Sequence, residues 1–407
     1  MRNVVLLLSF VVLMSSCKTY EQHGGLRWSD AFQPIDEKYP VDVFAAKLSN
    51  DSALLVIKLL GTEKTKNLNW KDSLPFTFMV YVDTTSGDKF FFHDSTSITI
   101  QTKTISTGED FVTTMPFSLR NNFKWIRVDI QSTGLNYRRM VELPAVSSLA
   151  PLIVDSLDVP VNPAMLHAWE AYRLITPVAT STKILRYPFP RNPASPAYRN
   201  NDLSSTHLLS DTTLALTMTN GLRFDEPGVY RYSDTISGAD FSVSVNDVSF
   251  PFIRTAEEMV KPLRYITKNE EYNRMLTATN AKSAVDSFWL AKSKADLIAR
   301  KSIRVFYNRV EEANRLFTTY LPGWMTDRGM MLIMYGPPDR AFKFKEGEIW
   351  TYTKNFPRTL EFVFIRKESF LGFDYQLRRD QEYLTSWNQQ SFKWRTGGIL
   401  NDVQDIF

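Results

Sequence analysis

The chain of 407 residues contains one cysteine, Cys17, and this limits how its folded state can be stabilised. No disulfide can form within one copy of the chain, so stability must come from packed cores. The length also exceeds the roughly 250 to 300 residues at which a single core stops growing. The sequence therefore predicts two or three domains, each with a core of its own.

The residues before Cys17 resemble the signal peptide of bacterial lipoproteins. Arg2 supplies a positive charge, residues 4–14 are apolar or small, and two serines stand beside the expected cleavage site. The apolar stretch is too short for a permanent transmembrane helix, which needs about 20 residues. We therefore expect residues 1–16 to be a signal peptide and Cys17 to be the lipidation site. An ordinary secretory signal with an incidental cysteine is the alternative.

Lipidation at Cys17 would attach several acyl chains, palmitate among them, and two or more chains hold a protein stably on a membrane. Residues 17–40 show little periodicity and are expected to form a tether. Lys18 follows the cysteine, whereas the lipoproteins that this segment resembles carry aspartate there when they stay in the inner membrane. The resemblance therefore implies an outer-membrane lipoprotein whose body lies in the periplasm.

The charge of the chain gives no support to nucleic-acid binding. The formal net charge is +4, and no basic run of the kind that follows a phosphate backbone is present. Beyond the leader, no apolar stretch is long enough to cross a membrane. We expect a body that contacts the membrane only through its N-terminal lipid and that has no nucleic-acid partner.

Short runs of β-branched and aromatic residues fill the chain between residues 41 and 252, separated by turn-forming clusters. About seven such runs lie within residues 41–148, and several alternate between apolar and polar residues, as is typical of an immunoglobulin-like sandwich. They are residues 43–46, 53–59, 76–82, 89–93, 97–104, 125–130 and 138–143. Similar runs resume over residues 149–252. The sequence predicts an immunoglobulin-like β-sandwich over the first range and a second, smaller β domain over the other.

After residue 253 the period of the apolar residues becomes helical. Thr255 with acidic residues after it indicates a helix N-terminus, and residues 294–320 carry the longest apolar stripe. Strands are expected again at residues 330–334, 348–353, 360–365 and 374–377. The sequence therefore predicts a helical and α+β domain over residues 253–407, in a multidomain chain that is mainly β.

The segment 321–339 is distinctive and reads Leu-Pro-Gly-Trp-Met-Thr-Asp-Arg-Gly-Met-Met-Leu-Ile-Met-Tyr-Gly-Pro-Pro-Asp. It resembles the GWxTD domain of bacterial envelope proteins, whose pentapeptide corresponds here to residues 323–327. The resemblance implies an envelope-associated module without an established chemical activity. The residues that carry it are Gly323, Trp324, Thr326, Asp327, Arg328, Gly329, Tyr335, Gly336, Pro337, Pro338 and Asp339.

Physical chemistry accounts for this segment without catalysis. Pro322 and Gly323 are suited to end the long helix, and Trp324 to fold back over the sheet as an anchor. The Thr-Asp pair that follows can bond backbone N–H groups in a turn, and the next arginine can pair with a carboxylate. Gly329 would let the chain enter the following strand closely. On this interpretation the whole signature is structural.

The alternative is a ligand site built from Asp327, Arg328, Asp339 and Arg340, in which the two carboxylates act as acid and base. Few other residues suggest chemistry. The four histidines are scattered, and no metal-ligand spacing, nucleophile elbow, P-loop or dinucleotide fingerprint appears. We predict no catalytic residue, no metal site and no cofactor, and leave the ligand site open.

These observations favour a non-enzymatic adaptor or structural subunit of an envelope assembly, with an envelope protein as its partner. The alternative is a carbohydrate- or peptide-binding protein, or a hydrolase, that uses carboxylates and aromatic residues of the α+β domain. A binding platform needs those aromatic residues partly exposed, whereas an adaptor buries them. The residues concerned are Trp350, Tyr352, Phe362 and Phe364.

The C-terminal tail, residues 379–407, carries aromatic residues without strand alternation. Tyr383 and Trp387 have a helical spacing that fits docking into a groove. The tail is expected either to pack back on its own domain or to dock onto the partner.

Overall fold

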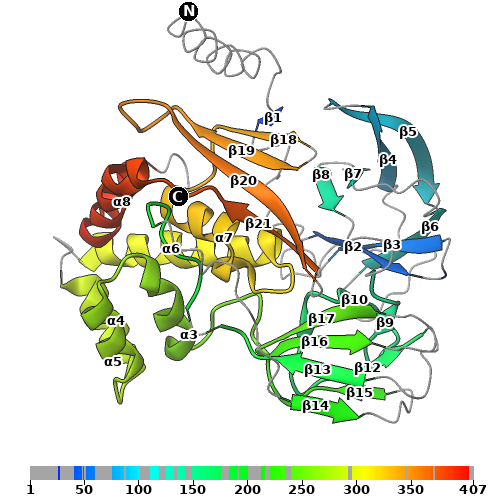
Figure 1. Ribbon diagram of the computed structural model, residues 1–407, viewed down its shortest axis with the longest axis horizontal. Helices are drawn as coiled ribbons and strands as arrows, with labels where there is room; N and C mark the ends of the chain where they lie inside the picture. Colours follow the sequence, from blue (N-terminus) through cyan, green and yellow to red (C-terminus); the bar gives the residue numbers. More distant parts are fainter. Residues whose placement is uncertain are drawn as a thin grey trace, which may run out of the picture.

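The computed structural model describes most of the chain from residue 41 onwards, and Figure 1 shows the arrangement. Cys17, the expected signal peptide and most of the expected tether lie outside the described residues. Within them, no helix combines the length and apolar character that crossing a membrane requires. The described ranges are 26–27, 41–47, 49, 52–59, 76–86, 89–100, 111–118, 125–132, 135–142, 149–175, 183–190, 192–199, 212–215, 221–233, 240–291, 296–344, 346–369 and 372–402.

Two antiparallel sheets form the first β region. A three-stranded sheet has the order β2-β3-β6, and a four-stranded sheet has the order β5-β4-β7-β8. The strands are β2 (Val41–Lys47), β3 (Ser52–Leu59), β4 (Phe76–Ser86), β5 (Lys89–Ile100), β6 (Phe111–Ser118), β7 (Trp125–Ser132) and β8 (Leu135–Glu142).

Two details of this region differ from the sequence-based expectation. Strand β6 was not expected, and two runs expected to be separate strands, on either side of residues 94–96, form the single strand β5. Asp94 and Ser95 resemble a turn in sequence, but here they pair with Val82 and Tyr81 of β4. The register shifts at the neighbouring His93, so a local irregularity follows these residues and the strand continues.

Two further sheets form the second β region. One is a four-stranded sheet, β10-β9-β12-β15, and the other a five-stranded sheet, β11-β17-β16-β13-β14. The aromatic residues Tyr172, Phe224, Tyr230, Tyr232 and Phe241 fill the core of this region. The strands are β9 (Ile153–Val154), β10 (Pro160–Val161), β11 (Leu166–His167), β12 (Ala171–Leu174), β13 (Lys183–Tyr187), β14 (Thr212–Ala215), β15 (Gly221–Arg223), β16 (Gly228–Ser233) and β17 (Asp240–Asn246).

Helices and one antiparallel sheet form the remainder. Thr255 begins the first helix with a capping box that Glu258 completes, as its sequence indicates. The helices are α3 (Ala256–Val260), α4 (Asn269–Leu276), α5 (Ala281–Leu290), α6 (Asp296–Phe317), α7 (Asp327–Tyr335) and α8 (Leu384–Thr396), with short 3-10 turns η3 (Lys261–Tyr265), η4 (Gly323–Met325), η5 (Gln381–Tyr383) and η6 (Gly398–Asn401).

The sheet has the order β1-β18-β19-β20-β21. Its first strand comes from the segment expected to be a plain tether, because Leu26 pairs with Ala341 and Arg27 with Arg340. The strands are β1 (Leu26–Arg27), β18 (Arg340–Phe344), β19 (Gly347–Tyr352), β20 (Leu360–Ser369) and β21 (Gly372–Leu377).

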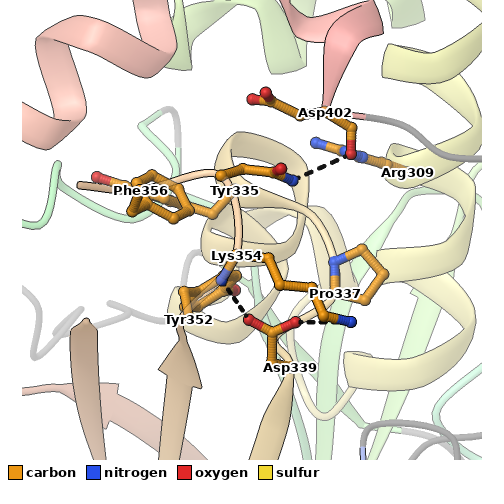
Figure 2. A pocket seen from close by; sticks show the side chains of 9 residues that line it. Arg309, Tyr335, Pro337, Asp339, Tyr352, Lys354, Phe356 and Asp402 are labelled. Carbon is orange, nitrogen blue, oxygen red and sulfur yellow. Dashed lines mark hydrogen bonds and ion pairs between the residues drawn. The ribbon is translucent and has the colours of Figure 1, made fainter. Parts of the chain in front are cut away.

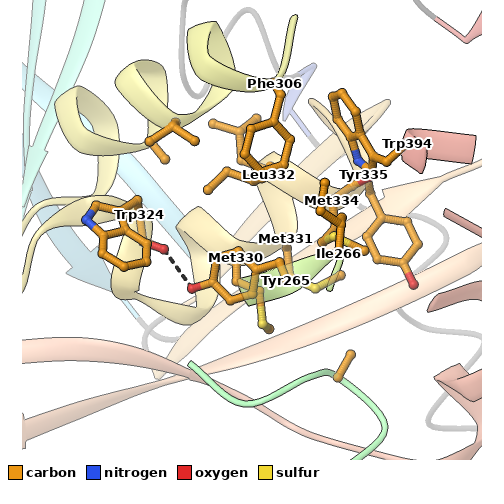
Figure 3. Packing of buried hydrophobic residues seen from close by; sticks show 14 of the residues in the cluster. Tyr265, Ile266, Phe306, Trp324, Met330, Met331, Leu332, Met334, Tyr335 and Trp394 are labelled. Carbon is orange, nitrogen blue, oxygen red and sulfur yellow. Dashed lines mark hydrogen bonds between the residues drawn. The ribbon is translucent and has the colours of Figure 1, made fainter. Parts of the chain in front are cut away.

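The expected strand at residues 330–334 is wrong, because these residues lie in α7. Thr326 caps this helix, and all nine of its residues are buried. A helix that is buried on every side shows no polar face, so its sequence is a plain apolar run that periodicity cannot distinguish from a buried strand. Figure 3 shows Met330, Met331, Leu332 and Met334 of α7 among the core side chains.

The described part of the C-terminal tail packs back on its own domain. Tyr383, Trp387 and Ile399 are buried there, and Trp394 is fully enclosed. The indole N–H of Trp394 donates to the carbonyl of Met334 at 3.1 Å, and its ring stands edge-on to Phe306 with 5.1 Å between centroids (Figure 3). Of the two expectations for the tail, self-packing describes residues 379–402.

Candidate functional site

The loop between α6 and α7 packs so closely against both helices that two positions in this part of the chain have no room for a side chain. A Cβ atom at Gly323 would lie 2.6 Å from the carbonyl carbon of Ala313 and 2.8 Å from Cα of Asn314. A Cβ at Gly329 would lie 2.7 Å from the carbonyl carbon of Gly323. Real Cβ atoms do not come within 3.0 Å of other atoms. Gly329 therefore serves a close approach inside a helix, and not the entry to a strand.

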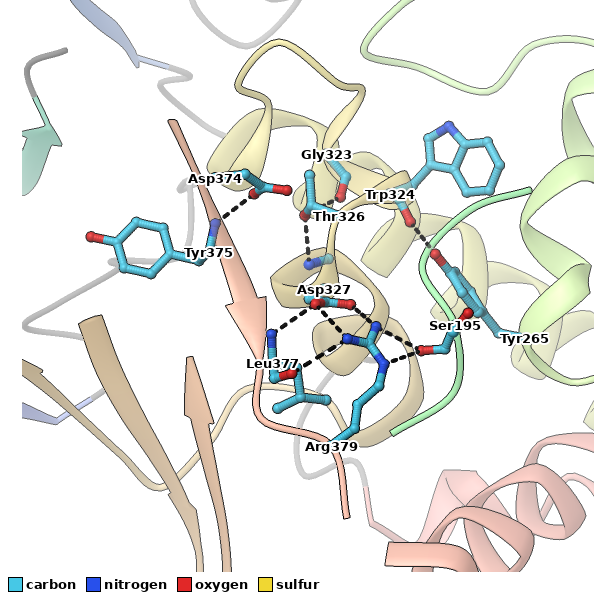
Figure 4. A network of polar contacts seen from close by, with 11 residues as sticks. Ser195, Tyr265, Gly323, Trp324, Thr326, Asp327, Asp374, Tyr375, Leu377 and Arg379 are labelled. Atoms are coloured by element: carbon cyan, nitrogen blue, oxygen red, sulfur yellow. Dashed lines mark hydrogen bonds and ion pairs between the residues drawn. The ribbon is translucent and has the colours of Figure 1, made fainter. Parts of the chain in front are cut away.

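The turn that holds Trp324 is fixed by hydrogen bonds to the backbone of this residue. The Trp324 N–H donates to Oδ1 of Asn314 at 3.0 Å. Its carbonyl accepts a hydrogen bond of 2.7 Å from the hydroxyl of Tyr265 (Figure 4). The indole ring stands edge-on to Tyr265 with 6.4 Å between centroids. The ring thus packs on η3, in the helical layer, and the expectation that it folds over the sheet is wrong.

Thr326 is the N-cap of α7. Its Oγ1 accepts a hydrogen bond of 3.1 Å from the N–H of Gly329 and donates one of 2.8 Å to the carbonyl of Gly323. The side chain is buried and both of its hydrogen-bonding roles are used within the turn. This agrees with the structural interpretation of the Thr-Asp pair.

Asp327 joins three parts of the domain through a buried ion pair. Its carboxylate accepts a hydrogen bond of 2.7 Å from the N–H of Leu377 in β21 and is paired with Arg379, whose Nη1 lies 3.1 Å from Oδ2 (Figure 4). Nη2 of Arg379 also donates to the carbonyl of Ser195 at 3.0 Å. Burial raises the pKa of the Asp327 carboxyl, and Arg379 opposes that rise without cancelling it.

Arg328 belongs to a second buried cluster, in which two cations share one carboxylate. Nη1 of Arg328 lies 3.2 Å from Oε1 of Glu348, and Nζ of Lys343 lies 3.1 Å from Oε2. The guanidinium also covers the ring of Tyr375 at 4.0 Å from its centroid. Burial alone would raise the pKa of Glu348, but Lys343 and Arg328 outweigh it and hold that pKa below its usual value.

The second half of the signature, Tyr-Gly-Pro-Pro-Asp, closes onto the end of β19. Gly336 has a φ of +80°, and its carbonyl accepts a hydrogen bond of 2.9 Å from the hydroxyl of Tyr352. Asp339 accepts hydrogen bonds from the N–H of Thr353 at 2.6 Å and of Lys354 at 2.9 Å. Partial burial pushes the pKa of Asp339 up, but these N–H groups, the Thr353 hydroxyl and the Lys354 ammonium hold it below its usual value.

A cavity of about 340 Å³ lies beside this second half of the signature (Figure 2). Tyr335 and Tyr352 line it with aromatic side chains, Asp402 closes it from beyond η6, and Arg309 reaches it from α6. The guanidinium of Arg309 extends into this space in Figure 2, although the residue is only 8% exposed. A Cβ atom at Gly336 would lie 2.7 Å from its Nη2, so the glycine makes room for the cation.

The sequence profile of the GWxTD domain matches residues 228–396, a range that contains the signature turn, the two buried ion-pair clusters and most of the cavity lining. The protein contains a GWxTD domain. No curated protein matches the chain. The matched range begins at Gly228 in β16, so the GWxTD profile takes in β16 and β17 as well as the helices and the C-terminal sheet.

The residues suspected of forming a ligand site do not come together. Asp327 and Asp339 lie at opposite ends of α7, each with its own partners. Arg328 is buried with Glu348, whereas Arg340 is exposed. Among the described residues, no group of three or more His, Cys, Asp or Glu side chains is placed to hold a metal ion.

The aromatic platform is not present either, because all four of its expected members are buried. Trp350, Phe362 and Phe364 have no exposed surface, and Tyr352 is 3% exposed. They belong to the core that α7 and the sheet share. A ligand that stacks on Trp350, Phe362 or Phe364 would have no access to those rings, and Tyr352 exposes only a small part of its surface, to the cavity described above.

Sequence reasoning missed several residues that the structure brings into the GWxTD domain's polar contacts, namely Arg309, Asn314, Lys343, Glu348 and Arg379. Two of them carried a signal. Glu348 is on the same strand face as Trp350 and Tyr352, and Arg309 follows Phe306 and precedes Ala313 on the apolar stripe of α6. A charged residue at an inward-facing position indicates a buried ion pair or a binding group. Arg379 carried no such signal, because it is 52 residues from Asp327.

Proposed function

We propose that this GWxTD domain protein is a non-enzymatic adaptor or structural subunit of an envelope assembly, anchored in the outer membrane by a lipid on Cys17. Its body would lie in the periplasm and bind an envelope protein. The leader before Cys17 and Lys18 after it support the anchor.

One observation carries the non-enzymatic part of the proposal: the polar groups of the signature are committed to contacts within the domain. Asp327 is 5% exposed and holds Arg379 and Leu377, and Arg328 is 5% exposed and holds Glu348. A general acid or base must come within hydrogen-bonding distance of a substrate. Carboxylates enclosed in this way stabilise the fold. A domain whose signature residues make only internal, stabilising contacts suits a structural role in an assembly.

We propose in addition that the first β region is an immunoglobulin-like sandwich. Its first, second and fifth strands share one sheet, and its third, sixth and seventh strands share the other, with the fourth on the edge of the latter. Immunoglobulin-like domains divide their strands between two sheets in a similar manner. Strands β2 and β8, from different sheets, are also in contact. Such modules commonly serve binding, which fits an adaptor.

The anchor is tested by comparing the wild-type protein with Cys17→Ala and Cys17→Ser in the native host. The proposal predicts that an alkyne analogue of palmitate labels the wild type but neither variant, and that only the wild type sediments with outer membranes. Equal labelling of the variants, or a wild-type protein in the soluble fraction, would contradict it. Trypsin added to intact cells distinguishes the faces, since a periplasmic body is protected until the outer membrane is permeabilised.

The adaptor role is tested with the tagged wild-type protein, cross-linked in cells and purified from solubilised outer membranes. A fixed stoichiometry between the protein and one envelope partner is expected. A protein that is monomeric after cross-linking, or that turns over a cell-wall polymer when purified, would refute the role.

A further inference from the structure

The cavity beside the Tyr-Gly-Pro-Pro-Asp segment contains a buried cation whose donors are largely unused. Arg309 makes one hydrogen bond, of 3.2 Å from Nη1 to the carbonyl of Ile333, and its guanidinium lies 5.1 Å from the ring centroid of Trp394. No carboxylate lies within ion-pair distance of it among the residues that the structure describes. A guanidinium offers five N–H donors in a planar fork, so this buried charge has donors to spare.

The other charged groups of the cavity are already paired. Nζ of Lys354 lies 3.5 Å from Oδ1 of Asp339, and Oδ2 of Asp402 accepts a hydrogen bond of 2.6 Å from Nζ of Lys393. Counting these two pairs as neutral leaves Arg309 and the carboxyl group that acts on it most strongly, Glu312 of the same helix. Burial raises the pKa of Glu312 to about 7, so this carboxyl group is only partly ionised at neutral pH and does not fully neutralise Arg309. Burial lowers the pKa of Arg309 to about 10, so the guanidinium stays protonated at neutral pH. The site therefore has room for one negative charge.

The walls of the cavity are more polar than apolar, with small exposed parts of aromatic side chains among them, and they fit a small ligand. Tyr335, Tyr352 and Phe356 present aromatic side chains, with Tyr335 and Tyr352 at 5.8 Å between ring centroids. The hydroxyls of both tyrosines are engaged, one with Ser386 and the other with the carbonyl of Gly336, so the rings are fixed. A volume of about 340 Å³ is at the small end of the range for ligand sites.

We propose that this cavity binds a small monocarboxylate, with Arg309 forming a forked ion pair to the carboxylate and the body of the ligand lying against the half-buried Phe356. A planar carboxylate matches the guanidinium fork and carries the one negative charge that the site can balance. A phosphate dianion fits less well because its second negative charge would have no cation to pair with, since Lys354 and Lys393 are already paired. The carboxylate belongs either to a free organic acid or to the C-terminal residue of a peptide.

The first experiment measures binding to the purified wild-type chain by isothermal titration calorimetry, with benzoate, benzamide and inorganic phosphate as probes. Benzamide has the shape of benzoate without its charge, so benzoate should bind at least about tenfold more tightly than either other probe, as expected for hydrogen bonds to a charged group. N-acetylphenylalanine and its amide then distinguish the two sources. If the protein binds N-acetylphenylalanine more tightly than benzoate and discriminates against its amide, the ligand is the C-terminus of a peptide. If it binds benzoate more tightly, the ligand is a free organic acid.

The second experiment places the ligand on Arg309. Arg309→Met should abolish the preference for benzoate over benzamide, while Arg304→Met, which removes an exposed arginine from the same helix, should keep it. If Arg309→Met fails to fold, Arg309→Lys serves instead, because it keeps a positive charge but removes the planar fork, and it should bind benzoate more weakly than the wild type does. In the wild type, benzoate should also protect Arg309, and not Arg304, from modification by phenylglyoxal, as measured by peptide mass spectrometry.

Equal binding of benzoate and benzamide, or no binding of benzoate at tens of millimolar, would overturn the proposal. A folded Arg309→Met protein that still prefers benzoate would do so too. Neither result bears on the lipid anchor or on the adaptor role, which are tested separately.

Discussion

Replacing Gly323 by alanine tests most sharply whether the signature turn is packed backbone to backbone against α6. The new Cβ would lie 2.6 Å from the carbonyl carbon of Ala313, whereas ordinary van der Waals contact begins at 3.4 Å. The loop or the helix must therefore move by about 0.8 Å, and the oxygen of the same carbonyl demands a larger shift. Both neighbours are backbone atoms, so no side chain can rotate away to relieve the clash.

The cost follows from what that shift breaks. Overpacking in a core costs about 1 to 3 kcal/mol even where side chains can adjust. The movement also strains the hydrogen bond from Trp324 to Asn314 and the Thr326 cap, each worth about 1 kcal/mol. We expect Gly323→Ala to lower the free energy of unfolding of the GWxTD domain by at least about 3 kcal/mol.

The assay is urea unfolding followed by tryptophan fluorescence, which reports on this domain through Trp289, Trp324, Trp350, Trp387 and Trp394. Because the chain has several domains, the transition is assigned by near-UV circular dichroism before midpoints are compared. Gly221→Ala is the matched control, since its Cβ would have no neighbour within 4 Å and should change stability by less than about 0.5 kcal/mol. Equal midpoints for the two variants would refute the close-packing argument.

Three further predictions concern the buried polar groups and the tail. Asp327→Asn should destabilise the domain by about 3 to 5 kcal/mol because it leaves Arg379 buried without its partner. In a double-mutant cycle, the double variant with Arg379→Met should recover part of that loss. If the two changes in the free energy of unfolding simply add, the pairing is contradicted. Glu348 has a pKa below its usual value in the folded protein, so its ionised form stabilises the fold. That contribution is complete above the pKa of about 4.3 expected for an unfolded glutamate. It is lost as the pH falls through the lower pKa of the folded state. Urea midpoints between pH 6 and pH 3 should therefore fall more steeply for the wild type than for Glu348→Gln, and parallel curves would count against the assignment. Deleting residues 380–407 should lower the unfolding temperature markedly, because the enclosed Trp394 and the buried Trp387 leave the core, and an unchanged temperature in a thermal scan would show that the tail does not stabilise the domain.

Much of this architecture follows from local sequence signals. The switch from short β-rich runs to helical periodicity correctly places helices after residue 253, and Thr255 with Glu258 forms the capping box that begins α3. The signature motif predicts the GWxTD domain, which the family profile confirms. Thr326 acts locally, within the turn it caps, so its structural role was also predictable.

The parts that sequence missed depend on contacts between distant segments. Helix α7 is enclosed on all sides, so its apolar run resembles a buried strand. The pairing of Asp327 with Arg379 and the approach of Asp402 to Arg309 arise only when the tail folds back over the domain. No spacing along the chain predicts those contacts. Glu348 and Arg309, in contrast, are recognisable in the sequence because each is a charged residue at a position where the periodicity predicts an apolar one.

The central claim, that the signature stabilises a scaffold and takes no part in chemistry, is tested most directly by measuring folding and envelope-complex formation together. Gly323→Ala, Asp327→Asn, Asp339→Asn and Glu348→Gln would each be expressed in the native host. For each variant, limited proteolysis gives the folded fraction, and cross-linking followed by purification gives the amount of complex. The account predicts that the amount of complex per folded molecule stays at the wild-type value in all four variants. A variant that is as folded as the wild type but has lost the complex would contradict it.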